Sequence, residues 1–217
     1  MTDPIENTKH TKLHQSFTFW FTFFKKGKEK QIDEFEENLK EIGSISTAEE
    51  FWGIYQHMKR PSNLTRGCEF FLFKKDIKPM WEDPANHNGG RFIILAKKIA
   101  ANNKIWEDML VAFIMLDQSG DYLNGLVLNV RTHEIYISLW TKTLSTEQYA
   151  KTIDWLKSII ELTTEISIDY KHHPSQEELT SKQGMGIREE EDRKARLMSE
   201  NLEAANSQEQ EKKTHEN

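Results

Sequence analysis

The sequence has a single cysteine, Cys68, among its 217 residues. One thiol excludes an internal disulfide framework and every metal or redox site that needs paired cysteines. No apolar run approaches the roughly 18 residues that a membrane-spanning helix needs. The first residues, Met1–Asn7, lack the basic-then-apolar pattern of a secretory signal peptide. We therefore expect a protein of a reducing compartment, the cytoplasm, without a membrane anchor.

Apolar side chains are also scarce, because they make up 37% of the chain while charged residues make up 29%. The acidic residues (35) outnumber the basic ones (29), so the net charge is −6. This balance argues against a protein that coats nucleic acid non-specifically. What the chain does have is aromatic: 6 Trp, 12 Phe and 5 Tyr.

The aromatic residues are confined to one part of the chain. Residues 175–217 carry 11 acidic and 7 basic residues but no aromatic side chain. Such a segment cannot bury enough apolar surface to offset its loss of conformational entropy. We therefore expect a flexible arm at 1–12, a folded domain at 13–174 and a disordered polar tail at 175–217.

The hydrophobic patterns predict an alternation of strands and helices within the domain. Thr47 followed by Glu50 indicates a capped helix start, and Asn102 or Asn103 is a candidate cap for the next helix. The expected strands are 17–24, 35–42, 69–73, 91–96, 122–131, 135–140 and 166–170, and the expected helices are 48–58, 103–114 and 146–162. This order predicts an α+β fold in which one curved antiparallel sheet carries three helices on its convex face. The concave face would then be free to hold a ligand.

Trp81 and Glu82 stand between loop-forming residues, Pro79 on one side and Pro84 on the other. Trp81 is either a lid that packs on the core or a platform that stacks on a flat heterocycle. In the second case Glu82 would accept hydrogen bonds from the edge of a guanine ring.

Arg131 follows a predicted strand, and two interpretations of it remain open. It belongs either to a solvated hairpin turn or to a phosphate site, because the guanidinium fork matches phosphate oxygens. The pair His172-His173 lacks the spacing of a metal site and is expected at the surface. The acids at 33–37 are expected on a solvated strand edge. No nucleophile elbow, Walker loop or dinucleotide fingerprint occurs, so we expect neither an enzyme nor a cofactor.

Several motifs together resemble the translation initiation factor 4E family, which binds the 5′ cap of mRNA. They cover about residues 13–174 in the same order of elements. The motifs are His57–Pro61, Leu72–Lys74, Ile77–Asp83, Asn88–Gly90, Asn129–Arg131 and Leu139-Trp140.

The resemblance implies a slot in which two aromatic side chains clamp 7-methylguanine. Trp81 matches one of them, and Phe35 stands where most members have the other, a tryptophan. Glu82 would bond the guanine edge, and Trp140 would touch the methyl group. The implied phosphate ligands are Arg131, Arg91 and His133, the last of which stands where ordinary members have lysine.

Phe17 and Phe35 both stand where the main class has tryptophan, and this resembles class II, the 4E-homologous proteins. The stretch Ile137–Thr143 is also similar to that class. Class II implies a selective regulator or repressor of translation. Because phenylalanine is a smaller cation–π partner than tryptophan, we expect cap affinity to be about 1 kcal/mol weaker than with a Trp–Trp clamp.

The family also docks short helices of 4E-binding proteins on its convex, helical face. Trp52 matches the central residue of that surface, unless it is an ordinary core residue of its helix. Asp108, Val111 and Ala48 stand at the other matching positions. The implied partners are therefore capped mRNA and 4E-binding proteins, with the chain acting as a monomer. The alternative is a protein–protein adaptor of the same fold with little or no cap binding.

Overall fold

The computed structural model describes residues 10–24, 32–96, 99–131, 134–160 and 166–173. The chain divides into two units, residues 1–173 and 174–217, and the described residues all belong to the first. The expected arm and tail lie almost entirely outside the described residues, so the boundaries of the domain stay predictions.

Within those ranges the chain forms seven strands, four α-helices and two short 3-10 helices. In chain order they are β1 (Lys12–Phe23), α1 (Ile32–Asn38), β2 (Lys40–Thr47), α2 (Ala48–Tyr55), η1 (Pro61–Asn63), β3 (Cys68–Lys74), β4 (Gly90–Ala96), α3 (Ile99–Ile114), η2 (Gln118–Gly120), β5 (Leu123–Val130), β6 (Ile135–Thr141), α4 (Thr146–Ile159) and β7 (Ile166–His172).

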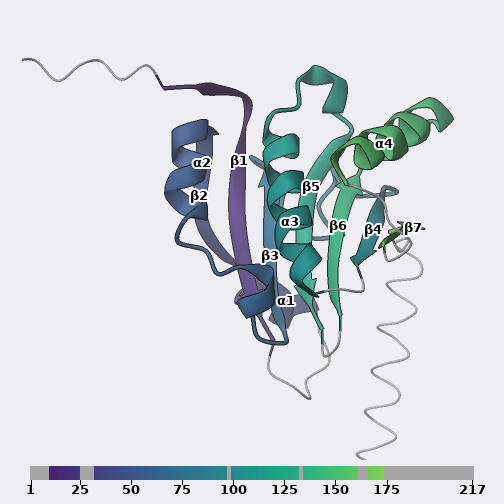
Figure 1. Cartoon of the computed structure of the whole chain (residues 1–217). Coiled ribbons are helices and arrows are strands. Elements are labelled where there is room, and N and C mark those ends of the chain that lie inside the picture. Colours follow the sequence, from purple (N-terminus) through teal and green to yellow (C-terminus); the bar gives the residue numbers. More distant parts are fainter. Residues whose placement is uncertain (1–9, 25–31, 97–98, 132–133, 161–165, 174–217) are drawn as a thin grey trace, which may run out of the picture. The chain divides into compact units, whose positions relative to one another are not determined.

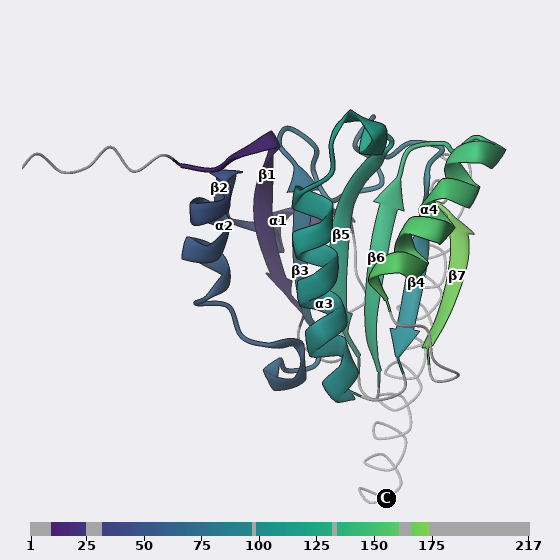
Figure 2. The ribbon, with the colours of Figure 1, turned by 45° about the horizontal axis from the view of Figure 1, so that its top comes forward.

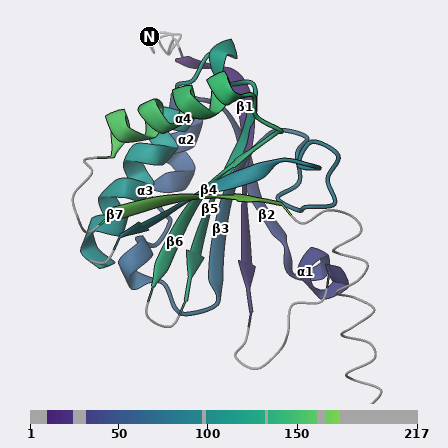
Figure 3. The same cartoon turned by 90° about the vertical axis from the view of Figure 1, so that its right-hand side faces the viewer.

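The strands form one sheet in the order β2-β1-β3-β5-β6-β4-β7, and every neighbouring pair is antiparallel. Helices α2, α3 and α4 cover one face of this sheet (Figures 1 and 2), whereas α1 lies on the opposite side (Figure 3). The predicted α+β fold with a curved antiparallel sheet and three helices on one face is confirmed.

The alternation of side chains along the strands explains how the sheet carries two apolar faces. On β1, Phe17 and Phe19 point to the helices and are fully buried in the main core. On β3, Phe71 and Phe73 point to the other face, where they cluster with Val127. Because both faces of β3 are covered, every residue of this central strand is buried.

Hydrogen bonds cap the first turns of α2 and α4, and for α2 they are the ones predicted from the sequence. Glu50 N donates to Thr47 Oγ1 at 3.2 Å, and Thr47 N donates to Glu50 Oε2 at 3.2 Å, so the predicted capping box is present. Ser145 and Gln148 make the same reciprocal pair at the start of α4. These bonds satisfy backbone donors that the first turn of a helix leaves unpaired.

One predicted strand is misplaced, and one predicted helix starts earlier than expected. Residues 32–38 form helix α1, and β2 begins only at Lys40, so Phe35 and its acidic neighbours are not on a strand. Helix α3 begins at Ile99, so neither Asn102 nor Asn103 caps it. Asn103 instead accepts from Ser62 N at 2.9 Å and donates to Ser62 Oγ at 3.0 Å, which fastens η1 to the helix.

No helix in the described part of the chain is long and apolar enough to cross a membrane. The same residues contain no group of three or more His, Cys, Asp or Glu side chains that would hold a metal ion. Cys68 is buried at the start of β3.

A substitution at Gly125 in β5 tests the packing on the face of the sheet that α2, α3 and α4 do not cover. A Cβ at this position would lie 2.4 Å from ring atoms of Phe73, which packs edge-on against Trp140 at 5.5 Å. We predict that Gly125→Ala lowers the free energy of unfolding by about 1–3 kcal/mol, because the ring must move. Gly53→Ala in α2 is the control, since its Cβ would meet nothing within 4 Å. It should leave stability unchanged or raise it in urea unfolding.

Candidate functional site

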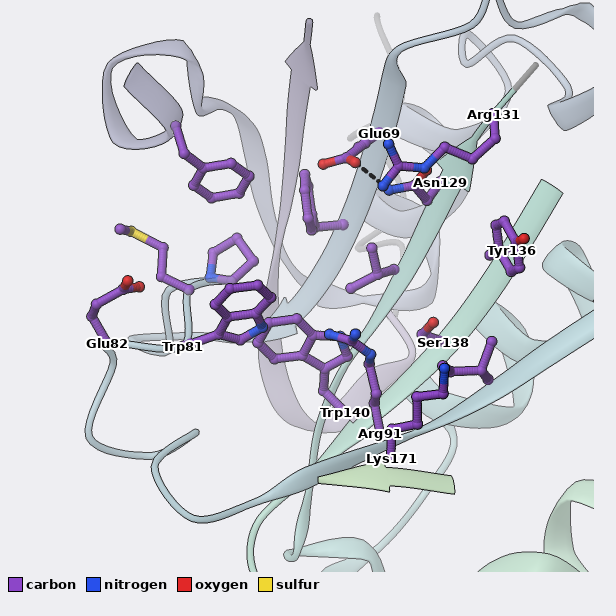
Figure 4. Close-up of a pocket in the computed structure, with 16 residues that line it drawn as sticks. Glu69, Trp81, Glu82, Arg91, Asn129, Arg131, Tyr136, Ser138, Trp140 and Lys171 are labelled. Carbon is purple, nitrogen blue, oxygen red and sulfur yellow. Dashed lines mark hydrogen bonds between the residues drawn. The ribbon is translucent and has the colours of Figure 1, made fainter. Parts of the chain in front are cut away.

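A pocket of about 650 Å³ opens on the face of the sheet that α2, α3 and α4 leave free (Figure 4). It contains aromatic, acidic and basic side chains from helix α1, two loop regions and five strands. The lining residues are Phe35, Glu69, Phe71, Pro79, Met80, Trp81, Glu82, Arg91, Ile93, Val127, Asn129, Arg131, Tyr136, Ser138, Trp140 and Lys171.

The pairing of the strands arranges the side chains of the pocket in rows that run across the sheet. Glu69 pairs with Asn129, which pairs with Tyr136, so one row is polar. A second row begins with Trp140, which pairs with Arg91, and Arg91 pairs with Lys171. The floor therefore changes from polar and acidic at one end to aromatic and basic at the other.

Trp81 lies in the loop between β3 and β4, and this loop is held by its own side chains. Asp83 Oδ2 accepts from Lys78 N at 2.8 Å, and its Oδ1 accepts from Ala85 N at 2.9 Å. The buried Asn86 donates through Nδ2 to Lys78 O at 2.9 Å and to Met80 O at 2.7 Å. These bonds bracket Trp81 and Glu82 on both sides in the chain.

Phe35 reaches the pocket from α1, a segment distant in sequence from the loop of Trp81. Its ring stacks on Phe24 with centroids 5.9 Å apart and meets the edge of Phe71 at 6.1 Å. Lys78 Nζ and Glu36 Oε1 form an exposed ion pair at 2.7 Å, which joins α1 to the loop of Trp81. Two segments distant in the sequence thus bring an aromatic ring each to one pocket.

The glycine pair before β4 allows the loop to approach the sheet closely. A Cβ on Gly89 would lie 2.1 Å from Thr141 O, and one on Gly90 would lie 2.3 Å from the Tyr170 hydroxyl. Neither position tolerates a side chain, so the two glycines set where β4 starts and where Arg91 enters the pocket.

Arg91 places its guanidinium carbon 5.9 Å from the centre of the Trp81 ring, within the range of a cation–π contact. Figure 4 shows the Arg91 guanidinium and the Glu82 carboxylate on opposite sides of Trp81. Burial lowers the pKa of Arg91, but a guanidinium stays protonated at neutral pH. The pocket therefore holds a fixed positive charge against its aromatic wall.

Two further basic side chains of the pocket are exposed. Lys171 on β7 and Arg131 after β5 both line the pocket. Arg131 N donates to Glu134 O at 2.9 Å across the β5–β6 turn. Tyr136 hydrogen-bonds Glu134, and that bond raises the pKa of the Tyr136 hydroxyl. Figure 4 places Arg131 and Lys171 on the side of the pocket away from Glu82.

Glu69 is a buried carboxylate in the polar row, only 4% exposed. Asn129 donates its side-chain amide to Glu69 Oε1, as the dashed line in Figure 4 marks. A buried carboxylate of this kind needs partners, and the bond orients Asn129 beside Arg131.

Trp140 packs against His173, with ring centroids 4.3 Å apart. The His173 ring is buried, and its Nδ1 lies 3.0 Å from Asn86 O. Because that oxygen is a carbonyl, Nδ1 carries the proton and donates. Desolvation lowers the pKa of His173 to about 4. The bond to Asn86 opposes this shift in part, and the nearby Arg91 and His172 add to it.

The structure brings together six of the residues proposed for the cap site: Phe35, Trp81, Glu82, Arg91, Arg131 and Trp140 all line the pocket. The seventh, His133, lies outside the described residues. Phe17 is on the helical face, edge-on to Phe113 at 5.2 Å, and contributes to the core instead of the pocket. The expectation that His173 is at the surface is wrong, because the ring is only 6% exposed.

Sequence reasoning missed Glu69, Asn129 and Lys171. Glu69 and Lys171 belong to none of the motifs, and Asn129 belongs to the motif Asn129–Arg131 without having been proposed for the site. Counting every second residue along β3, β5 and β7 would have placed them on the pocket face once the pairing of the strands was known.

On the helical face, Trp52 of α2 is 46% exposed, so it is not a core residue. Its ring contacts Phe51 and Tyr55 edge-on, at 5.0 and 5.8 Å. On α3, Asp108 pairs with Lys104, and Val111 is partly buried against the core.

Ala48 begins α2, and its N–H donates to Thr11 O at 2.9 Å. With Trp52, Asp108 and Val111, it makes up the set of residues proposed for the partner-binding surface. All four are on helices that cover the same face of the sheet (Figure 2).

Residues 12–186 match the profile of the family described as Eukaryotic initiation factor 4E. The match spans most of the chain and every described element. The chain belongs to the translation initiation factor 4E family. A wheat member of the family, eukaryotic translation initiation factor NCBP, is 37% identical over 164 residues, which are 74% of this chain and 69% of the wheat protein.

Solved structures of the family show the same fold. The Ascaris suum protein eIF4E-3, in complexes with an m7G cap and with an m2,2,7G cap, superposes with a TM-score of 0.69. The m7G complex is 32% identical and covers 76% of this chain and 92% of that one. Caenorhabditis elegans eIF4E-3, in complex with the 4E-binding protein Mextli and a cap analogue, has a TM-score of 0.65 at 30% identity, over 74% of this chain and 92% of its own.

The buried His173 predicts a specific pH dependence of stability. Its folded pKa is about 4 against an ordinary 6.5, so the fold favours the neutral ring. That contribution is complete above about pH 6.5 and is lost as the pH falls toward 4. In urea unfolding at pH 7, the wild type should have a larger free energy of unfolding than His173→Asn. This difference should shrink as the pH falls from 6.5 to 4, because only the wild type loses the contribution of the neutral ring. A difference independent of pH would contradict the assignment, and His172→Asn at the exposed neighbour is the control.

Proposed function

We propose that this chain binds the 7-methylguanosine 5′ cap of mRNA and regulates translation initiation in the cytoplasm, as a monomeric binding protein without catalytic activity. The observation that carries the proposal is the pocket itself. Phe35 and Trp81 reach it from two separate segments. A carboxylate stands at its rim, and basic side chains line the side away from that carboxylate. The cap has the complementary parts in that order: a flat cationic ring, a donor edge and a chain of phosphates.

The aromatic pair supplies the discrimination between methylated and plain guanine. Methylation at N7 gives the purine a delocalised positive charge, which the faces of Phe35 and Trp81 attract. Stacking on aromatic side chains adds about 1–3 kcal/mol per base. Unmethylated GTP lacks the charge, so it gains the stacking energy without the cation–π contribution.

Glu82 reads the edge of the same ring. A carboxylate accepts hydrogen bonds from the ring N–H and the exocyclic amine of guanine, and these bonds are strengthened because both partners carry charge. Trp140, in the floor of the pocket, contacts the methyl group.

Arg91 occupies one side of the Trp81 ring before ligand binds. A cationic purine would compete for that aromatic face, and the guanidinium would then turn toward the phosphates. Arg131, Arg91 and His133 hold those phosphates, and Lys171 adds a further cation on β7. Electrostatic binding of this kind weakens with added salt.

We propose further that the chain acts as a class II member, a selective regulator or repressor. Phe35 supports this, because it provides a smaller aromatic wall where the main class has tryptophan. The exposed Trp52 supports the docking of a partner helix on the helical face, as 4E-binding proteins require. Recruitment through that face would let other proteins choose the messages that this chain binds.

Retention on immobilised 7-methyl-GTP tests the proposal. The wild type should be retained and should be released by 7-methyl-GTP but not by GTP. Trp81→Ala and Glu82→Ala should each abolish retention, because each removes one of the contacts that recognise the base. Trp52→Ala, which removes an indole from the opposite face, is the matched control and should be retained. If the folded wild type washes off, the adaptor alternative is correct instead.

Phe35→Trp should strengthen binding. A larger aromatic face is a better cation–π partner, so we predict a gain of about 1 kcal/mol, or about fivefold in Kd for 7-methyl-GTP. Fluorescence titration measures it, and Phe24→Trp, one ring further from the ligand, is the control. An unchanged or weaker affinity for Phe35→Trp would count against Phe35 as a wall of the slot.

Lys171→Ala should weaken the binding of 7-methyl-GTP more than that of 7-methyl-GMP, since a lysine near the phosphates contributes in proportion to their charge. We predict a loss of about threefold to tenfold for the triphosphate at low salt and a smaller loss at high salt. Lys157→Ala on α4 controls for net charge. Equal losses for both ligands would place Lys171 away from the phosphates.

A further inference from the structure

We propose that three buried polar side chains, Asn86, Asn124 and His173, are positioning residues that hold the loop of Trp81 and Glu82 in its ligand-ready arrangement. This inference rests on the proposed function, because it concerns how the same site is built. None of the three lines the pocket. They act through the loop that does.

Asn86 is the centre of the cluster. It is fully buried, and its side-chain amide donates to the carbonyls of Lys78 and Met80, at 2.9 and 2.7 Å. Its own carbonyl accepts from Gly89 N at 3.2 Å. One residue thus closes the loop, with its side chain bonded to the residues before Trp81 and its backbone carbonyl bonded to the glycine pair that follows.

Asn124 fastens this loop to the sheet. It is also fully buried, at the start of β5, and its Nδ2 donates to Ala85 O at 2.7 Å and to Asn86 Oδ1 at 2.9 Å. The second bond matters most, because it leaves Asn86 Nδ2 facing the Lys78 and Met80 carbonyls. Asn124 therefore sets the orientation of the Asn86 amide.

His173 fastens the loop from the end of β7. Its ring donates to Asn86 O at 3.0 Å, its backbone N–H donates to Gly89 O at 2.9 Å, and its other side packs against Trp140. One residue therefore connects the loop that carries Trp81 with the tryptophan in the pocket floor.

The geometry separates two parts of the site. The cluster anchors residues 78–89, which carry Trp81 and Glu82, the groups that recognise the base. The three side chains make no hydrogen bond to Arg131, which follows β5, or to Lys171 on β7, the two cations proposed to bind phosphate. Loosening the cluster should therefore reduce recognition of the methylated base and leave the recognition of phosphate by Arg131 and Lys171 intact. A loop ordered before binding loses less entropy when the ligand arrives.

The test uses the full chain and fluorescence titration with 7-methyl-GTP, GTP and 7-methyl-GMP. His173→Phe keeps a ring against Trp140 but removes the donor to Asn86. His173→Asn keeps an amide donor near the position of Nδ1 and removes the ring. Asn124→Leu keeps the volume and removes both bonds to the loop, and Asn124→Ser is a milder change at the same position. Urea unfolding is measured for every variant.

We expect His173→Phe and Asn124→Leu to lose about fivefold to twentyfold in affinity for 7-methyl-GTP. Their preference for 7-methyl-GTP over GTP should fall in parallel, while the ratio of 7-methyl-GTP to 7-methyl-GMP affinity stays at the wild-type value. His173→Asn should remain within about threefold of the wild type, and Asn124→Ser should lie between Asn124→Leu and the wild type.

Three results would overturn the proposal. The first is an unchanged preference for 7-methyl-GTP over GTP in His173→Phe and Asn124→Leu, and the second is an equal fall in that preference and in the ratio of 7-methyl-GTP to 7-methyl-GMP affinity. The third is a failure of all four variants to unfold cooperatively, which would mean that the cluster is needed for folding and not for positioning the loop. A folded wild type that does not bind 7-methyl-GTP would instead contradict the proposed function, and the same titration shows which has failed.

Discussion

The function proposed for this chain depends on one constraint: two aromatic rings from separate segments must face one pocket with room for a purine between them. Phe35 comes from a two-turn helix and Trp81 from a loop, so neither sits on the sheet itself. The sheet provides the rigid reference that both segments need. Its free face supplies Phe71 under Phe35 and Trp140 beside the loop, and the exposed pair Glu36–Lys78 joins the two segments.

The helical face of the sheet provides most of the stability, and the free face carries the residues proposed for recognition. The helical face contains the larger apolar core, in which Phe17, Phe113 and Trp106 are almost completely buried. The free face buries a smaller cluster and keeps charged groups such as Arg91 and Glu69 beside it, which costs desolvation energy. That cost is tolerable because the helical core stabilises the same strands. The arrangement explains how a pocket rich in charge can lie on an ordered sheet.

Much of the fold followed from local patterns, since the strands, the three large helices and the capping box at Thr47 depend on neighbouring residues. The errors occurred where distant contacts decide the structure. Asn103 looks like a helix cap, but its partner is Ser62, far away in the sequence. The segment around Phe35 is too short for helical periodicity to show. His173 is polar and near the end of the domain, yet the loop of Trp81 buries it. The pocket motifs were recognisable as a family pattern, whereas Lys171 and Glu69 became visible only with the strand register.

A crystal structure of the chain with 7-methyl-GTP tests the central claim most directly. The account predicts a purine stacked between the rings of Phe35 and Trp81, with its donor edge on Glu82 and its phosphates toward Arg131. A purine that stacks on Trp81 alone, with Phe35 still packed on Phe24 and Phe71 and out of contact with the ligand, would contradict it.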